Sequence, residues 1–115
     1  MNNVSLVGKL EDEPQILTKD GTNRFFYFKL RVLNENGNDV DRINCAVYNE
    51  MCAIFYTNCK KNDVISITGR IIPNTYMVQG VIVHSYNVVV NKVEVVASEQ
   101  INYRPNGKLK DEFKE

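Results

Sequence analysis

The chain has 115 residues, of which 43% are hydrophobic and 24% charged. This suits one globular domain with a single hydrophobic core and excludes a second catalytic lobe. Lysine and arginine total 14, as do aspartate and glutamate, so any surface that attracts a polyanion must come from charges segregated onto one face.

Alternating apolar side chains predict strands in the first third of the chain. Residues 4–10 form the first strand, and residues 15–18 begin a short hairpin that turns at 19–22. Residues 24–33 alternate most regularly, so one face belongs to the core and the other to the surface. The core face carries Phe26, Phe28, Leu30 and Val32. The outer face carries Phe25, Tyr27, Lys29, Arg31 and Leu33.

Residues 34–39, with the sequence NENGND, predict an exposed loop before the next strand, residues 42–48. In that strand, alternate side chains point to opposite faces of the sheet. The core face carries Ile43, Cys45 and Val47. The outer face carries Arg42, Asn44, Ala46 and Tyr48.

One short helix is predicted at residues 50–59, which contain neither glycine nor proline. Asn49 suits the N-cap position, and Met51, Ile54 and Phe55 have the spacing of one helix face. The sequence KKND at residues 60–63 then predicts a turn.

The rest of the chain reads as further strands. Residues 64–72 form one strand, which the Pro73-Asn74 pair is expected to end. A hairpin at residues 75–83 turns at Gln79-Gly80, and the valine-rich residues 85–97 form the last strand.

This order of elements predicts a small all-β barrel: five strands in a Greek key, with the helix between the third and fourth strands. Gly8 and Gly69 stand where strands of such a barrel must bend. The domain is expected to cover residues 1–97. Residues 98–115 are polar and charge-rich, which predicts a flexible tail.

Enzymes, metal proteins and membrane proteins find little support. His84 is the only histidine, and no phosphate-binding glycine loop or zinc-protease motif is present. Cys45, Cys52 and Cys59 lack metal-ligand spacing and are expected to be buried, free thiols in a reducing compartment. No apolar run approaches the roughly 18–20 residues of a membrane span, and the first residues do not form a secretory signal. We expect no catalysis, cofactor, metal or membrane contact.

Aromatic and basic residues recur on the outer faces of neighbouring strands. Exposed rings let bases stack, and nearby cations neutralise phosphates, so the pattern favours single-strand nucleic-acid binding. The alternative is that the tyrosines only pair across strands without a ligand. The candidate residues are Tyr27, Lys29, Arg31, Arg42, Asn44, Tyr48, Arg70 and Tyr76.

Ordered segments of the chain resemble the bacterial-type single-stranded DNA-binding protein family. The opening NNVSLVGKL with E-x-E-P, at residues 2–14, is the most similar. Later segments follow in the family's order: residues 28–30, 43–48, 60–64, 68–71 and 88–96. The resemblance covers about residues 1–97.

The resemblance implies an OB-fold that assembles, usually as a homotetramer, and wraps single-stranded DNA. Tyr48 and Tyr76 match stacking aromatics of the family, and Lys29 and Lys61 match positions that approach the DNA backbone. Arg42 stands where the family has a third aromatic, and Glu50 where it often has a cation. The sequence has no tryptophan, and its tail lacks the acidic tip that recruits replication and repair enzymes.

We therefore expect binding of single-stranded DNA with little sequence preference, in replication, recombination or repair. Tyr27, Tyr48 and Tyr76 would stack bases, while the cations engage phosphates. The expected location is the cytoplasm. There the protein would act in a bacterial nucleoid, or it would be encoded by a phage or mobile element. Two alternatives remain. One is a dimeric primosome, plasmid or phage relative that acts through a protein partner, and the other is an OB module used only for assembly.

Overall fold

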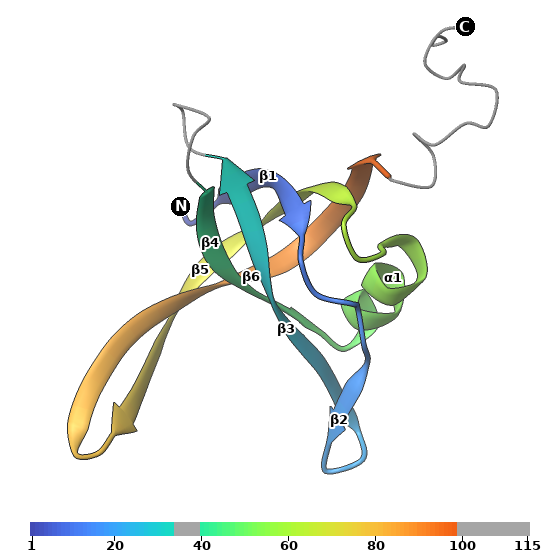
Figure 1. Ribbon diagram of the computed structural model, residues 1–115. Coiled ribbons are helices and arrows are strands. Elements are labelled where there is room, and N and C mark those ends of the chain that lie inside the picture. The colour runs from blue at the N-terminus through green and yellow to red at the C-terminus, as the bar shows by residue number, and fades with distance from the viewer. Residues whose placement is uncertain (34–39, 99–115) are drawn as a thin grey trace, which may run out of the picture.

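The computed structural model describes residues 1–33 and 40–98 (Figure 1). The loop predicted at 34–39 and the tail beyond Ser98 lie outside the described residues, and Ser98 itself is buried. Six strands and one helix follow in chain order. They are β1 (Val4–Leu10), β2 (Leu17–Lys19), β3 (Asn23–Leu33), β4 (Val40–Tyr48), α1 (Glu50–Asn58), β5 (Val64–Val78) and β6 (Val81–Ala97).

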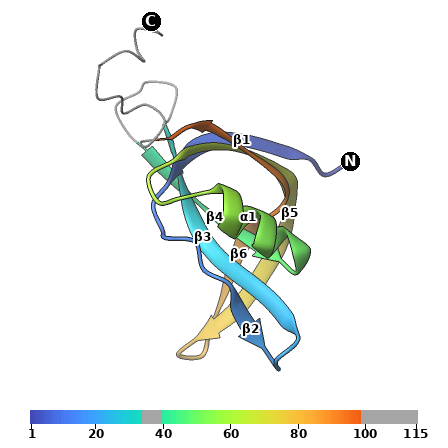
Figure 2. The same cartoon turned by 90° about the vertical axis from the view of Figure 1, so that its right-hand side faces the viewer.

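Five of these strands close into a barrel. The sheet order is β1-β5-β6-β4-β3-β2, and β1 also pairs with β3, which joins the two ends of the sheet through Lys9–Arg31 and Leu10–Leu30. All pairings are antiparallel except that of β4 with β6. The short β2 adds a hairpin to β3, and α1 lies in front of the barrel strands in Figure 2. The predicted all-β barrel with a helix before its fourth strand is confirmed.

Buried side chains fill the barrel as the alternation predicted. Phe26, Phe28 and Leu30 of β3 are buried, as are Cys45 and Val47 of β4. The helix closes this core with Phe55, whose ring stacks on Phe28 at a centroid distance of 4.7 Å. Each side chain of this size gains about 1.5–3 kcal/mol by leaving water.

One expected orientation was wrong, and one residue of the outer face is covered by its neighbours. Ala46 keeps the parity of the outer face but is fully buried, because its single methyl group lies between the larger Tyr27 and Val89 at the same level of the sheet. Ile54 was expected on the core face of α1 but is 46% exposed, while Cys52 and Phe55 are buried. A nine-residue helix against a curved barrel covers only a narrow stripe of its surface.

The start of α1 also differs from the prediction. Asn49 occupies the N-cap position but its side chain makes no capping hydrogen bond. Its φ of 54° is positive and its ψ is −121°, outside the left-handed helical region in which asparagine is enriched. Its backbone instead joins the helix to β3, since Asn49 N donates to Arg24 O over 2.9 Å and Asn49 O accepts from Cys52 N over 3.0 Å.

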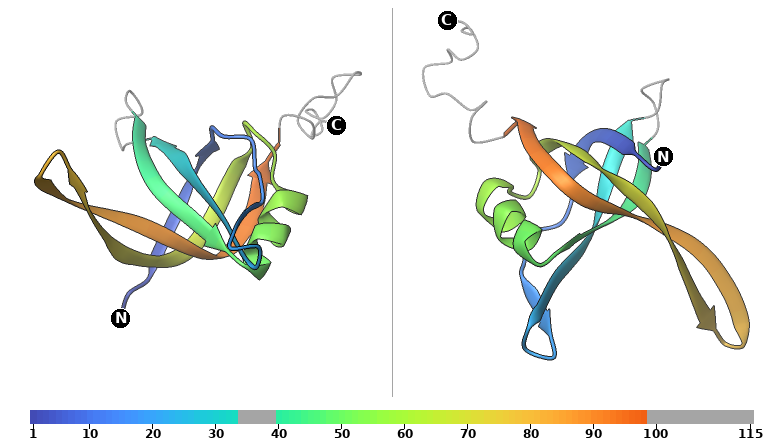
Figure 3. Two further views of the ribbon diagram at one scale, coloured as in Figure 1. Left: turned by 90° about the horizontal axis from the view of Figure 1, so that it is seen from below. Right: turned by 180° about the vertical axis from the view of Figure 1, so that it is seen from behind.

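A two-stranded arm, made by the far halves of β5 and β6, extends from the barrel (Figures 1 and 3). It turns at Gln79 and Gly80, both with positive φ, as predicted. The prediction that Pro73-Asn74 ends the strand was wrong, since pairing continues to Val78. The backbone of Ile71 points away from β6 and bonds to the Asn2 side chain. By the two-residue period Pro73 faces the same free edge, so its missing N–H costs no ladder bond.

Gly69 lies where this arm leaves the barrel, at a register shift between β5 and β6. A Cβ at this position would lie 2.0 Å from Val89 O, closer than real atoms approach. The strands can meet here only because residue 69 has no side chain, which agrees with the predicted bend.

The three cysteines are buried and free, as predicted. Burial raises the pKa of the Cys45 thiol to about 12 and, with help from the nearby Asp63 carboxylate, that of Cys59 to about 11. Burial also raises the pKa of Cys52. These thiols therefore remain protonated at neutral pH and are poor nucleophiles.

Candidate nucleic-acid interface

An open groove of about 630 Å³ crosses the outer surface of the barrel at the base of the arm. Its lining comes from the segment after β1 and from β3, β4, β5 and β6. It brings together five of the predicted residues, which are Tyr27, Lys29, Asn44, Tyr48 and Tyr76. The side chains that recur on outer strand faces in the sequence thus share one depression in the folded chain.

Strand register explains how this groove forms. Lys29 of β3 lies opposite Asn44 of β4, and Tyr27 lies opposite Ala46. The next strand places Val89 of β6 beside Ala46, and Arg70 of β5 beside Val89. Lys29 and Asn44 therefore lie side by side in the lining of the groove, and the row from Tyr27 to Arg70 crosses the same outer face.

Tyr27 and Tyr48 form one side of the groove. Their rings meet edge to face at 6.1 Å and 83°, and the Tyr48 hydroxyl donates to the Tyr27 hydroxyl over 3.4 Å. Partial burial, followed by the bond and proximity to Tyr27, raises the pKa of Tyr48 to about 12. The phenol is therefore neutral at physiological pH and does not repel a phosphate chain.

Tyr76 stands across the groove on the arm. It pairs with Val83 of β6 and is 48% exposed, while Tyr27 is 55% exposed. Rings with half their surface free can still accept a base on one face. The two sides of the groove come from segments about 30 to 50 residues apart in the chain.

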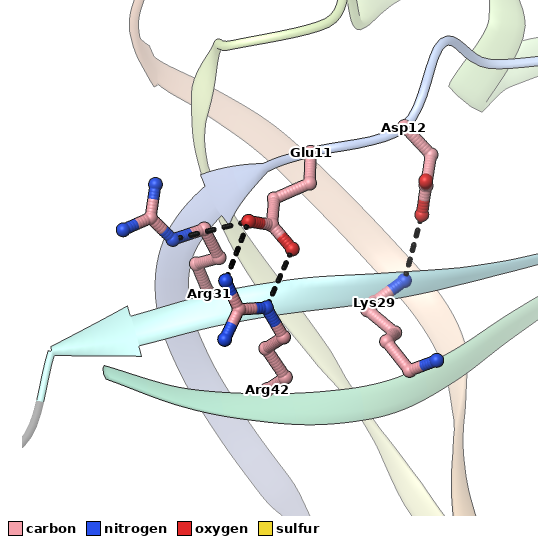
Figure 4. A network of polar contacts seen from close by, with 5 residues as sticks. All are labelled: Glu11, Asp12, Lys29, Arg31 and Arg42. Carbon is pink, nitrogen blue, oxygen red and sulfur yellow. Dashed lines mark hydrogen bonds and ion pairs between the residues drawn. The ribbon is translucent and has the colours of Figure 1, made fainter. Parts of the chain in front are cut away.

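Two acidic residues that the sequence analysis did not select border the basic face (Figure 4). Arg42 donates two hydrogen bonds to Glu11, from Nε to Oε1 over 3.0 Å and from a terminal nitrogen to Oε2 over 3.3 Å. Arg31 Nε lies 3.2 Å from Glu11 Oε2. In the unbound protein both arginines therefore contact Glu11, and their predicted contact with phosphates stays a prediction. In the sequence, only the acidic E-x-E-P segment after the first strand indicated that carboxylates could lie near these arginines.

Asp12 acts on the same face in a different way. Its carboxylate accepts a hydrogen bond of 3.1 Å from the backbone N of Lys29. The Lys29 ammonium points away from Asp12 in Figure 4, and Lys29 is exposed. Lys29 is therefore the lysine that the groove presents to solvent.

Lys61, Arg70 and Glu50 do not line the groove. Lys61 is exposed in the turn after α1, which Asp63 holds by accepting from Lys60 N over 2.8 Å. Arg70 is exposed on β5, at the level of Tyr27. Glu50 is exposed in the first turn of α1. Both cations flank the groove at most.

Sequence and structure comparisons now bear on this geometry. The family model described as the single-strand binding protein family matches residues 1–96. The chain belongs to the single-strand binding protein family. Single-stranded DNA binding is the general function that this membership supports, and single-strand binding proteins act on DNA without catalysis. Among curated proteins, no sequence matches the chain.

Solved structures of single-strand binding proteins share the fold. Mitochondrial Rim1 from S. cerevisiae, a single-stranded DNA-binding protein, is 14% identical with a TM-score of 0.70 and covers 84% of this chain and 95% of its own. The SSB domain of a Synechococcus protein is 16% identical with a TM-score of 0.63 and covers 81% and 93%. These likenesses establish the OB-fold.

Residues 1–33 and 40–98 contain no helix whose length and apolar character would let it cross a membrane. No three histidine, cysteine or acidic side chains in that part of the chain are grouped closely enough to hold a metal ion.

Proposed function

We propose that the protein binds single-stranded DNA with little sequence preference and that the strand lies in the groove at the base of the arm. The observation that supports this most is the lining itself, which joins three half-exposed or exposed tyrosines to Lys29 and Asn44. Stacking tolerates every base because each has a π-face, and a lysine recognises phosphate as a point charge.

The tyrosines and the cations take different roles in binding the strand. Tyr48 and Tyr76 stack bases from opposite sides of the groove, and Tyr27 adds a third ring beside Tyr48. Lys29 engages a phosphate within the groove, while Arg70 and Lys61 attract the strand where it enters and leaves. Such a protein would protect exposed strands during replication, recombination or repair, in a bacterial cytoplasm or in a cell that carries a phage or mobile element.

A mobility-shift assay with single-stranded DNA, duplex DNA and RNA probes tests this function. We expect a shift of single-stranded DNA at about 50 mM salt and a weaker one at about 200 mM, because the logarithm of the affinity falls by about 0.7 per neutralised phosphate for each tenfold rise in salt. Stronger binding to duplex, or no binding to any probe, would contradict the proposal.

A second candidate function is assembly through the arm. The face of the arm opposite the groove carries Met77, Ile82 and Tyr86, which are 66%, 57% and 62% exposed. Met77 pairs directly with Ile82, and Tyr86 pairs with Pro73, so two apolar pairs lie on this face, with the Thr75–His84 pair between them. Exposed apolar surfaces of this kind mark contacts with other proteins. We propose that these side chains join copies of this chain, and that the assembly is a tetramer in preference to a dimer.

Light scattering tests the assembly. We expect a mass near four times the 13.2 kDa of one chain, and we expect Ile82→Asp to lower it, because a buried, unpaired carboxylate opposes association. Val81→Asp is the matched control, since Val81 is 64% exposed and pairs with Val78 on the groove face. A mass of one chain for the unsubstituted protein would exclude this assembly.

A further inference from the structure

Arg31 and Arg42 lie directly opposite each other on neighbouring strands, although two like charges in such a cross-strand pair repel. The Glu11 carboxylate lies between them and contacts both (Figure 4). Two guanidinium groups arranged around one anion are suited to a carboxylate and to a phosphodiester alike, since both present two oxygens to the planar N–H fork.

The Glu11 carboxylate does not accept a hydrogen bond from every N–H donor of the two arginines. Arg31 Nε is buried and has no hydrogen-bond partner within residues 1–33 and 40–98. Glu11 Oε2 lies 3.2 Å away as an ion-pair partner, but it accepts from a terminal nitrogen of Arg42 and not from this N–H. A buried donor without an acceptor is costly, so an anion placed differently from Glu11 would bind better here.

We propose that Arg31 and Arg42 form an anion site for one phosphodiester of the bound strand, and that Glu11 occupies this site until the strand displaces it. This inference rests on the proposed function. Glu11 then acts as an internal competitor, which lowers the affinity of the protein for single-stranded DNA because its contacts with the two arginines must be broken before the phosphodiester can bind.

The site continues the groove. Glu11 itself lines the groove beside Lys29. Arg31 follows Lys29 by two residues on the same face of β3, a step of about 6.6 Å. On β4, Arg42 precedes Asn44 in the same way. A strand that leaves the groove along these two strands therefore meets the arginine pair next.

Glu11 can leave the site without disturbing the fold. Its backbone follows Leu10, which is anchored because Leu10 N donates to Asp63 O over 2.9 Å. The side chains of Glu11, Arg31 and Arg42 are 28%, 36% and 51% exposed, and ion pairs at such partly exposed positions are weak. Rotation of one side chain into solvent is enough to free both arginines.

Replacement of Glu11 by glutamine tests the competition directly. In titrations of fluorescent oligo(dT), we expect Glu11→Gln to raise the affinity about three- to tenfold, as the loss of two weak ion pairs allows. The bound strand contacts the same phosphates in both proteins, so the slope of log affinity against log salt should change little while the affinity rises. Glu13→Gln is the matched control: it makes the same change in charge two residues away, at an exposed position, and should raise the affinity less than Glu11→Gln does.

A second variant distinguishes the effect of side-chain length at position 11 from the effect of its charge. Glu11→Asp keeps the charge but is one methylene shorter and cannot contact both arginines, so it should also raise the affinity and also decides the question if Glu11→Gln does not fold. In a chain that already carries Arg31→Gln and Arg42→Gln, Glu11→Gln should add nothing beyond the effect of Glu13→Gln in that background.

Three results would overturn the inference: equal effects of Glu11→Gln and Glu13→Gln, weaker binding by a folded Glu11→Gln variant, or wild-type affinity for Glu11→Asp. These results differ from a failure of the proposed function, in which the unsubstituted protein itself does not bind oligo(dT). Binding that depends on Tyr48 and Tyr76 but not on Glu11 would refute the competitor alone.

Discussion

Replacing Tyr48 and Tyr76 together by alanine is expected to weaken binding to oligo(dT) by about a hundredfold or more. Each base stacked on an aromatic side chain contributes about 1–3 kcal/mol, and 1.4 kcal/mol corresponds to tenfold in affinity. The two rings stand on opposite sides of the groove, on β4 and on the arm, so no single neighbouring ring can replace both.

The fold should survive this double substitution. Tyr76 is 48% exposed, and the hydroxyl of Tyr48 bonds to the hydroxyl of Tyr27, which is itself exposed. Fluorescence titration at fixed low salt measures the affinity, and far-ultraviolet circular dichroism checks the fold. Tyr56→Ala is the control, because Tyr56 is 50% exposed on α1 and lines no part of the groove. If the double variant and the control both bind like the unsubstituted chain, the stacking mechanism is wrong.

Replacing Phe55 by alanine is expected to lower the free energy of unfolding by about 3–5 kcal/mol, the usual cost of removing a buried phenylalanine ring. Phe55 is 1% exposed. Its ring stacks on Phe28 at 4.7 Å and meets Phe26 at 6.1 Å, so the substitution opens a cavity between α1 and β3. Since whole domains of this size gain only about 5–15 kcal/mol from folding, such a loss is a large share of the total.

Urea unfolding followed by circular dichroism measures this loss. Ile54→Ala is the matched control, because Ile54 neighbours Phe55 on α1 but is 46% exposed, and its substitution should change the unfolding free energy by well under about 1 kcal/mol. Equal effects of the two substitutions would mean that α1 does not pack against the barrel through Phe55.

Alternation along the strands predicted the barrel well because a half-buried strand must point every second side chain into the core. Phe26, Phe28 and Leu30 are buried for this reason. Alternation did not predict the burial of Ala46, which depends on the size of its neighbours, and the presence of a proline did not predict that β5 continues past Pro73, which depends on which edge of β5 has no partner strand. Neither neighbour sizes nor free edges can be seen in one strand alone.

The groove was partly predictable. Strand parity and the family resemblance predicted the five residues that line it: Tyr27, Lys29, Asn44, Tyr48 and Tyr76. The ion pairs of the two arginines could not be predicted, since Glu11 precedes Arg31 by 20 residues and Arg42 by 31. Only closure of the barrel, through the pairing of β1 with β3, brings the end of β1 over the basic face.

The sequence by itself thus determined the strands, the helix, the inward faces and the kind of ligand, because these follow from short-range periodicity and from the chemistry of rings and cations. The tertiary structure alone decided which cations are available, because charges pair with whatever the fold brings within a few ångströms. Lys29 is presented to solvent, whereas Arg31 and Arg42 are held by an acidic residue from a distant segment.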